Sequence, residues 1–257
     1  FFRETGFLSG GDEPPMMLTG HTDAINRLSF NHDGSRLASA SKDWTVKTWD
    51  LANRRETLSL RQTRTMYAVA FSPDGQRLVS VGLDGQVRLW DALTYQQLAH
   101  AAHYKSGLLG VALSPDGRYL AVAGDAGVVT VCDARSLKLH WQVKGHTRWL
   151  SALAFSADSR QLASGGNDRV IKVWDVATAK DLHTLKEHRG EIIGLAFTAD
   201  GAQLISGSDD ATIKVWDLTP APEKGTEPLN SKDPVPYWTC GLIVARARGE
   251  FKGMSQE

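Results

Sequence analysis

The sequence predicts an all-β fold built from about five repeated units, and three observations support this prediction. A Trp-Asp or Cys-Asp pair recurs at spacings of 41, 42, 42 and 42 residues, with its aspartates at Asp50, Asp91, Asp133, Asp175 and Asp217. Each pair ends two short apolar, β-branched runs joined by turn residues, which is typical of a β-hairpin. Each hairpin is preceded by an alternating apolar segment and followed by a more polar one, with no helical periodicity between them. Four antiparallel strands per repeat predict a β-propeller of about five blades.

The strands of one unit can be placed in order along the fourth copy. Its first strand is expected at Leu150–Phe155, where apolar and small residues alternate. The second and third strands form the hairpin of residues 162–176, in which residues 165–168 supply the turn. A fourth, more polar strand is expected at Asp181–Leu185. The first two strands of the second copy are joined by Ser-Pro-Asp-Gly at residues 72–75, where proline presets a turn and glycine accepts a positive φ.

The repeats divide the chain into three parts. Residues 1–18 are interpreted as a remnant that includes a closing strand, residues 19–218 as the five-repeat propeller, and residues 219–257 as a proline-rich linker and tail. Pro220 and Pro222 exclude a fourth strand in the fifth unit, because proline cannot donate to a sheet ladder. Our hypothesis is that residues 16–19 lie antiparallel to residues 212–216 and close a five-bladed ring. The alternatives are an open arc, in which residues 16–19 pair with nothing or with a remnant blade at residues 7–12, and a truncated piece of a larger propeller.

Composition excludes several classes of partner. With 29 basic and 29 acidic residues the chain has no net charge to recruit nucleic acid or an anionic membrane surface. No apolar run approaches the ~20 residues of a membrane helix, and no secretory signal is visible, so a cytoplasmic location is expected. Cys132 and Cys240 have no metal-like spacing, so neither a metal nor a cofactor is predicted. The absence of an initiator methionine hints at a piece of a longer protein.

The residue pairs at the beginnings and ends of the repeats resemble those of a known protein family. Two units begin with Gly-His, at His21 and His146, and four end with Trp-Asp, at Trp49, Trp90, Trp174 and Trp216. With the Pro-Asp-Gly turns between them, residues 20–218 resemble the WD-repeat (WD40) β-propeller family. The resemblance implies a rigid, non-catalytic scaffold that binds a protein or peptide on its top face.

The resemblance also assigns a structural set of His, Ser, Asp and Trp to each complete copy. In the family the Asp accepts a hydrogen bond from the His, which is linked through the Ser to the Trp indole. The sets are His21, Ser39, Asp43 and Trp49; His146, Ser164, Asp168 and Trp174; and His188, Ser206, Asp210 and Trp216. A Ser/His/Asp group could also describe a nucleophile, but a catalytic centre is built once and these sets recur.

Two copies depart from the set. The second has Gln62 in place of His, with Ser80, Asp84 and Trp90 retained. The third keeps Asp125 and a His103 shifted by one residue, with Val122 in place of Ser and Cys132 in place of Trp. Blades two and three are therefore expected to hold their loops less firmly.

The family's binding positions surround the mouth of the central channel. Carried over residue by residue, they predict a partner-binding surface made of large apolar groups with a polar rim. These residues are Tyr67, Leu83, Leu109, Trp149, Ile193, Asn26, Lys42, Asn167, Glu191 and Asp209. The alternative is that the apolar side chains plug a narrow channel.

Three other functions compete with the scaffold interpretation. A propeller hydrolase needs carboxylates on facing elements, whereas Glu191 and Asp209 come from one blade and no acid is expected from blades two to four. A substrate receptor of a ubiquitin ligase would carry Trp-Asp-x-Arg, and the nearest match, residues 132–135, lacks the Trp. The third is a regulatory or docking fragment of a longer protein, for example a bacterial signalling protein, with no function of its own.

Overall fold

The computed structural model describes residues 16–102 and 106–219, and all regular structure in this part of the chain is β. Nineteen strands in these residues form five separate antiparallel sheets, each made of strands that are consecutive in the sequence. The sequence prediction of an all-β repeat fold with four-stranded units is therefore confirmed, with one exception in the fifth sheet. Within the described residues no helix is long and apolar enough to cross a membrane.

The sheets are the blades of the propeller. Blade 1 comprises β1 (Ile25–Phe30), β2 (Arg36–Ser41), β3 (Thr45–Asp50) and β4 (Arg55–Arg61). Blade 2 comprises β5 (Met66–Phe71), β6 (Arg77–Gly82), β7 (Val87–Asp91) and β8 (Gln97–Ala101). Blade 3 comprises β9 (Leu108–Leu113), β10 (Tyr119–Gly124), β11 (Val128–Asp133) and β12 (Leu139–Lys144). Blade 4 comprises β13 (Leu150–Phe155), β14 (Gln161–Gly166), β15 (Ile171–Asp175) and β16 (Asp181–Leu185). Blade 5 comprises β17 (Ile192–Phe197), β18 (Gln203–Ser208) and β19 (Ile213–Asp217).

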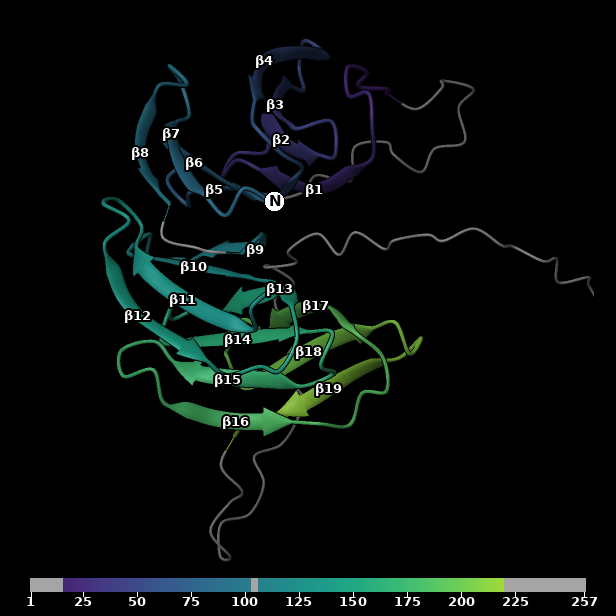
Figure 1. The fold of residues 1–257 in the computed structure, drawn as a ribbon, viewed down its shortest axis with the longest axis vertical. Helices are drawn as coiled ribbons and strands as arrows, with labels where there is room; N and C mark the ends of the chain where they lie inside the picture. The colour runs from purple at the N-terminus through teal and green to yellow at the C-terminus, as the bar shows by residue number, and fades with distance from the viewer. Residues whose placement is uncertain (1–15, 103–105, 220–257) are drawn as a thin grey trace, which may run out of the picture.

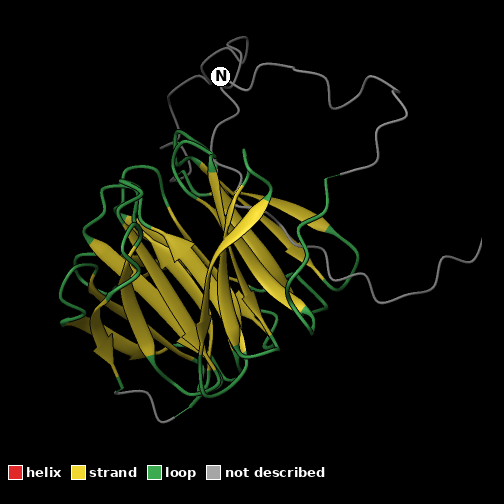
Figure 2. Ribbon diagram, turned by 90° about the horizontal axis from the view of Figure 1, so that it is seen from above, coloured by secondary structure: helices red, strands yellow, loops and turns green. Residues whose placement is uncertain are grey.

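The blades follow one another in an arc with the first strand of each blade innermost (Figure 1). First strands of consecutive blades contact one another from β1 to β17. Loops gather at the two ends of the strands (Figure 2). We call the end that carries the loops between second and third strands, where Asp43 and Asp168 lie, the top face.

The hydrophobic core lies between blades rather than within one. Ala163, Ile171 and Val173 of blade 4 pack in one cluster with Ile192 and Leu204 of blade 5. Three further clusters join blades 1 and 2, blades 2 and 3, and blades 3 and 4 in the same way. Blades 2, 3 and 4 therefore use both of their faces, one against the preceding blade and one against the following blade.

Among the described residues, the two end blades each leave one such face uncovered. Ile213 of blade 5 is 73% exposed, whereas Ile171, its equivalent in blade 4, is fully buried. At the other end of the arc, Ile25 is 46% exposed and its equivalent Ile192 is fully buried. The arc of described residues is open between blades 5 and 1.

The hypothesis that residues 16–19 close the ring is wrong. These residues form no strand, and β19 pairs only with β18 among the described residues. A physical reason is visible in the sequence. Pro14 and Pro15 directly precede this segment and cannot donate to a sheet ladder, so only a short stretch before His21 is available for pairing. The alternative partner at residues 7–12 lies outside the described residues.

Candidate partner-binding surface

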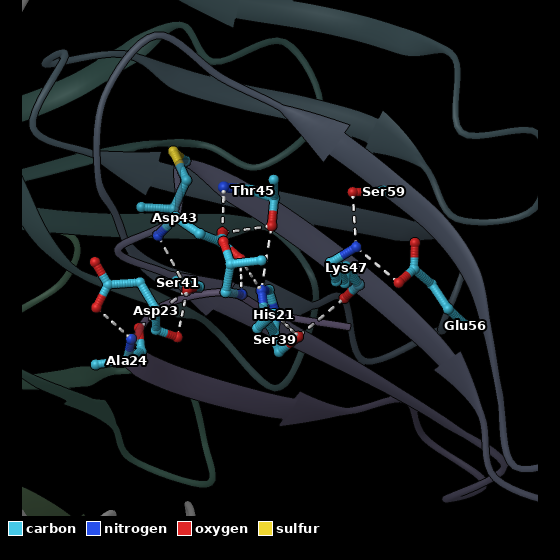
Figure 3. A network of polar contacts seen from close by, with 12 residues as sticks. His21, Asp23, Ala24, Ser39, Ser41, Asp43, Thr45, Lys47, Glu56 and Ser59 are labelled. Carbon is cyan, nitrogen blue, oxygen red and sulfur yellow. Dashed lines mark hydrogen bonds and ion pairs between the residues drawn. The ribbon is translucent and has the colours of Figure 1, made fainter. Parts of the chain in front are cut away.

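The His, Ser, Asp and Trp of blade 1 form one connected hydrogen-bond chain. Figure 3 shows three of them, His21, Ser39 and Asp43, in this network. His21 lies between two partners, with Nδ1 2.7 Å from Asp43 Oδ2 and Nε2 2.6 Å from Ser39 Oγ. The Trp49 indole donates to the same Ser39 Oγ at 2.8 Å. The chain joins the loop before β1 to both strands of the β2–β3 hairpin.

Blades 4 and 5 repeat this geometry. The His–Asp, His–Ser and Trp–Ser distances are 2.9, 2.8 and 2.8 Å in blade 4. They are 2.8, 2.7 and 2.8 Å in blade 5. The residues brought together are His146, Ser164, Asp168 and Trp174, and His188, Ser206, Asp210 and Trp216. We call these three hydrogen-bonded sets the tetrads.

The tetrads are poorly suited to nucleophilic catalysis. Ser39, Ser164 and Ser206 are all at most 1% exposed, so a substrate cannot reach their hydroxyl groups. Each hydroxyl oxygen also accepts from an indole, which occupies a lone pair that an attacking oxygen needs. The geometry instead satisfies buried polar groups and ties a loop to a hairpin.

The carboxylates of the tetrads have pKa values below the ordinary range. For Asp168, burial raises the pKa, but the hydrogen bond from His146, the charge of that imidazole and the backbone N–H of Thr147 together outweigh it. For Asp210, the hydroxyl of Thr212 and the backbone N–H of Arg189 lower the pKa most. The ionised carboxylate is therefore the form that the folded chain stabilises.

This shift predicts an acid-dependent loss of stability. Because the pKa of Asp168 is lower in the folded than in the unfolded chain, its contribution is present above the unfolded pKa, about 3.9, and is lost as the pH falls towards the folded value. We expect Asp168→Asn to be less stable than wild type at pH 7, with the difference shrinking below about pH 4. Urea unfolding of both proteins between pH 7 and pH 2.5 measures this. A difference that stays constant over that range would contradict the prediction.

Blade 2 replaces the missing His with an arginine. Ser80 still accepts from the Trp90 indole at 3.0 Å, but Gln62 makes no link to Asp84. Instead, Arg88 Nη2 lies 2.7 Å from Asp84 Oδ2, and both side chains are buried. The Asp of blade 2 therefore keeps a buried partner although the His is absent. The signal in the sequence is an Arg where the equivalent residues of blades 1, 4 and 5 are Lys.

Blade 3 replaces the tetrad with apolar packing. Val122 and Cys132 are both buried, whereas His103 lies outside the described residues. The indole of Trp141, on the fourth strand, donates to the backbone oxygen of Val176 at 2.7 Å and so connects this blade to blade 4.

At the inner end of the blades a cavity of about 370 Å³ opens, and all five blades line it. We call this cavity the funnel. Its wall combines aromatic and aliphatic groups with three carboxylates and one arginine. It is lined by Ile25, Asn26, Arg27, Tyr67, Leu83, Leu109, Asp125, Trp149, Ser151, Glu191, Ile193 and Asp209.

Most of the predicted partner-binding residues meet in the funnel. The five apolar ones, Tyr67, Leu83, Leu109, Trp149 and Ile193, all line it, as do Asn26, Glu191 and Asp209. Leu109 is buried and the other four apolar residues are half-buried, so they form a recessed wall rather than an exposed patch.

Two predicted residues lie elsewhere. Asn167 lines a neighbouring hollow of about 430 Å³ between blades 4 and 5, where it accepts from Arg148 Nη1 at 3.2 Å. Lys42 is half-buried and lines neither hollow. Asn26 lies in the funnel, but its amide already donates to the backbone oxygen of Met66 at 2.8 Å.

Sequence reasoning missed two charged residues of the funnel. Arg27 extends across it, and its Nη2 reaches the backbone oxygen of Ser151 in blade 4 at 3.5 Å. The equivalent positions in the other blades hold Ala or Gly, and this contrast was the available signal. Asp125 of blade 3 adds a carboxylate to Glu191 and Asp209, so the expectation that blades two to four contribute no acid to the channel is wrong.

The sequence that approximates Trp-Asp-x-Arg lies at the other end of the strands. Asp133 caps its own turn by accepting from the backbone N–H groups of Arg135 and Ser136 at 3.1 and 2.7 Å. Arg135 lines an open hollow with Arg118, Tyr119 and His140, remote from the funnel. Cys132 replaces the Trp, and Asp133 stabilises its own turn. The structure of the blade therefore accounts for Cys132 and Asp133 without a partner-binding role.

Repeated four-stranded sheets pinned by these tetrads define a WD-repeat β-propeller. Residues 12–50 match the family model for the WD domain, G-beta repeat. Residues 66–244, more than half of the chain, match the model described as the Echinoderm microtubule-associated protein second beta-propeller. The chain belongs to this family of WD-repeat propellers. Such domains generally serve as scaffolds that bind proteins or peptides.

Proposed function

We propose that the chain is a non-catalytic scaffold that binds a peptide or protein segment in the funnel. One observation carries this proposal: side chains from all five blades converge on a recessed cavity of about 370 Å³ whose wall combines aromatic and aliphatic groups with charged ones. Binding sites of this kind use aromatic and aliphatic groups for affinity and a few polar groups for orientation.

Trp149 and Tyr67 are the expected anchors of the ligand. They lie in blades 4 and 2, and both are half-buried, so a ligand can cover the part of each ring that solvent now reaches. Large rigid rings give much contact area for little loss of conformational entropy. Arg27 narrows the funnel, which favours a single inserted side chain over a deeply threaded chain.

The proposal is tested with peptides selected from a displayed random library on the wild-type chain. We expect the affinity of selected peptides to fall at least tenfold in Trp149→Ala and in Tyr67→Ala. Leu93→Ala is the control, since Leu93 is 73% exposed at the opposite end of blade 2. Peptides that bind wild type and both funnel variants equally would refute the funnel as the binding site.

The uncovered faces of blades 1 and 5 favour a second role, as a docking unit within a larger assembly. Ile25 and Ile213 occupy positions that are buried in every interface between consecutive blades of the arc. Sedimentation of the purified chain tests this role: a monomer at all concentrations argues against self-assembly through these faces.

A further inference from the structure

A hollow of about 530 Å³ lies at the end of blade 3 that is opposite the top face. Its lining residues come from the starts of β10 and β12, the end of β11 and the turns beside them. Three of them, Arg118, Arg135 and Lys138, are exposed cations, and Asp133 is the one carboxylate among its described lining residues. We call this cavity the basic hollow.

The charges of the basic hollow differ from those at the same place in the other blades. Arg135 aligns with small or apolar residues in the other four-stranded blades, namely Ala52, Leu93 and Ala177. Leu139 of the hollow aligns, by its place opposite the third strand, with Glu56, Gln97 and Asp181. The same strands form in all four blades, so blade 3 has a cation that the fold does not need and lacks the acid of blades 1 and 4.

Arg118 is held against an aromatic ring in the basic hollow. Its Cζ lies 5.7 Å from the centroid of the Tyr119 ring, and the His140 ring packs at a tilt on the same tyrosine, with centroids 5.2 Å apart. A guanidinium group stacked on a ring keeps its N–H groups available in its own plane. The stack also reduces the conformational entropy that Arg118 loses when it binds an anion.

The acids next to these cations already accept hydrogen bonds within their own turns. Asp133 accepts from the backbone N–H groups of Arg135 and Ser136 at 3.1 and 2.7 Å. Asp74, in the neighbouring turn of blade 2, accepts from the hydroxyl of Ser72. These hydrogen bonds lower the pKa of both carboxyl groups, and the charge of Arg135 lowers it further. Among the described residues, none of the three cations of the hollow forms an ion pair.

Exposed carboxylates flank the basic hollow at the same end of the blades. Asp116 lies two residues before Arg118, and its backbone N–H donates to Ser159 Oγ at 3.1 Å, beside Asp158 of blade 4. Asp74 lies on the side of blade 2. A nucleic acid or an anionic membrane would therefore meet like charges beside the hollow. The arrangement suits a compact anion whose neighbouring groups are neutral or basic.

We propose that the basic hollow binds a phosphorylated serine or threonine of a partner protein, in a segment whose neighbouring residues are neutral or basic. A phosphate group carries about −1.5 to −2 charges and three acceptor oxygens, so it can engage several cations at once. Arg118 and Arg135 offer the guanidinium groups that bind phosphate in bidentate geometry, and Lys138 adds a third positive charge. Leu139, which is 57% exposed, offers contact to an apolar residue beside the phosphorylated one.

The test uses the fluorescent peptide Gly-Lys-Ala-pSer-Leu-Ala-Lys-Gly, in which pSer is phosphoserine. We expect saturable binding by fluorescence anisotropy, weakened about tenfold or more when the phosphate is absent or when both lysines of the peptide are replaced by glutamate. Arg118→Glu and Arg135→Ala in the protein should each weaken binding to a similar degree. Both arginines are exposed, and Arg135→Ala introduces the residue of blades 1 and 4, so we expect both variants to keep the melting temperature of wild type.

Arg160→Glu is the matched control, because Arg160 is exposed and occupies the position of Arg118 in blade 4. This change should leave peptide binding unchanged, as should Trp149→Ala in the funnel, so the two proposed sites are tested separately. Equal loss in Arg160→Glu and Arg118→Glu would overturn the proposal by showing a general effect of charge.

The comparison of peptides needs no protein variant and stands if a variant fails to fold. Equal binding of the phosphorylated and unphosphorylated peptides would overturn the proposal, as would no binding of either at millimolar concentration. Glycerol 3-phosphate, added as a competitor, should displace the peptide only at concentrations well above those of the peptide itself. Displacement at equal concentration would assign the hollow to a small organic phosphate instead and would also overturn the proposal.

Discussion

Replacing Trp174 with alanine is expected to lower the free energy of unfolding by about 3–5 kcal/mol. The Trp174 side chain is 2% exposed, packs between blades 3 and 4 and stacks at a tilt on Trp141, with ring centroids 6.3 Å apart. Its removal leaves a cavity and takes away the indole that donates to the buried Ser164. Chemical denaturation of the purified variant measures this loss.

Trp149→Ala is the matched control for this loss. Trp149 is half-buried in the wall of the funnel rather than between blades, so we expect its replacement to cost about 1 kcal/mol or less. Similar losses for the two tryptophans would place Trp149 in the core and remove the main anchor of the proposed binding site.

The second large effect is expected from Ile171→Lys, which should cost more than about 4 kcal/mol or prevent folding. Ile171 is fully buried in the cluster between blades 4 and 5, where a lysine has no carboxylate to pair with among the residues of that cluster. Soluble yield and urea unfolding report the change.

The same substitution at the equivalent residue of blade 5 provides the comparison. Ile213 is 73% exposed, so Ile213→Lys should change stability by no more than about 0.5 kcal/mol. The two isoleucines occupy the same position in the repeat, so the effect of the substitution on strand propensity should be the same. The two sites differ in whether a following blade covers the side chain. An equally damaging Ile213→Lys would show that the trailing face of blade 5 is covered in solution.

The repeat in the sequence was sufficient to predict most of the fold. A hairpin that recurs about every 42 residues fixes where each blade begins, and alternation of apolar residues then places the strands, as in Leu150–Phe155 and Asp181–Leu185. The hydrogen-bonded sets around His21, His146 and His188 also follow from the pattern, because each set recurs at the same spacing.

The closure of the ring was not predictable from the same pattern. Residues 16–19 precede His21 as a fourth strand precedes later His residues, but Pro14 and Pro15 directly before them cannot donate to a sheet ladder. Position alone does not supply the hydrogen bonds of a ladder.

The two arginines were missed for a different reason. Arg88 and Arg27 look like ordinary surface charges in a strand, and each gains its role only in three dimensions. Arg88 pairs with Asp84 where a His is lost, and Arg27 crosses the funnel to another blade. Asp84 is only four residues from Arg88, and the contrast with Lys at the equivalent positions was the available signal. Ser151 is far from Arg27 in the sequence, and a local pattern does not contain that contact.

The measurement that most directly tests the division between structural and binding residues is a titration followed through the tryptophan indole N–H resonances. A peptide selected on the wild-type chain would be added to ¹⁵N-labelled protein. We predict that the resonance of Trp149 shifts as the peptide saturates, while those of Trp49, Trp90, Trp174 and Trp216, whose indoles donate to buried serines, stay in place. A titration in which Trp149 is unmoved and one of these four shifts would contradict the account.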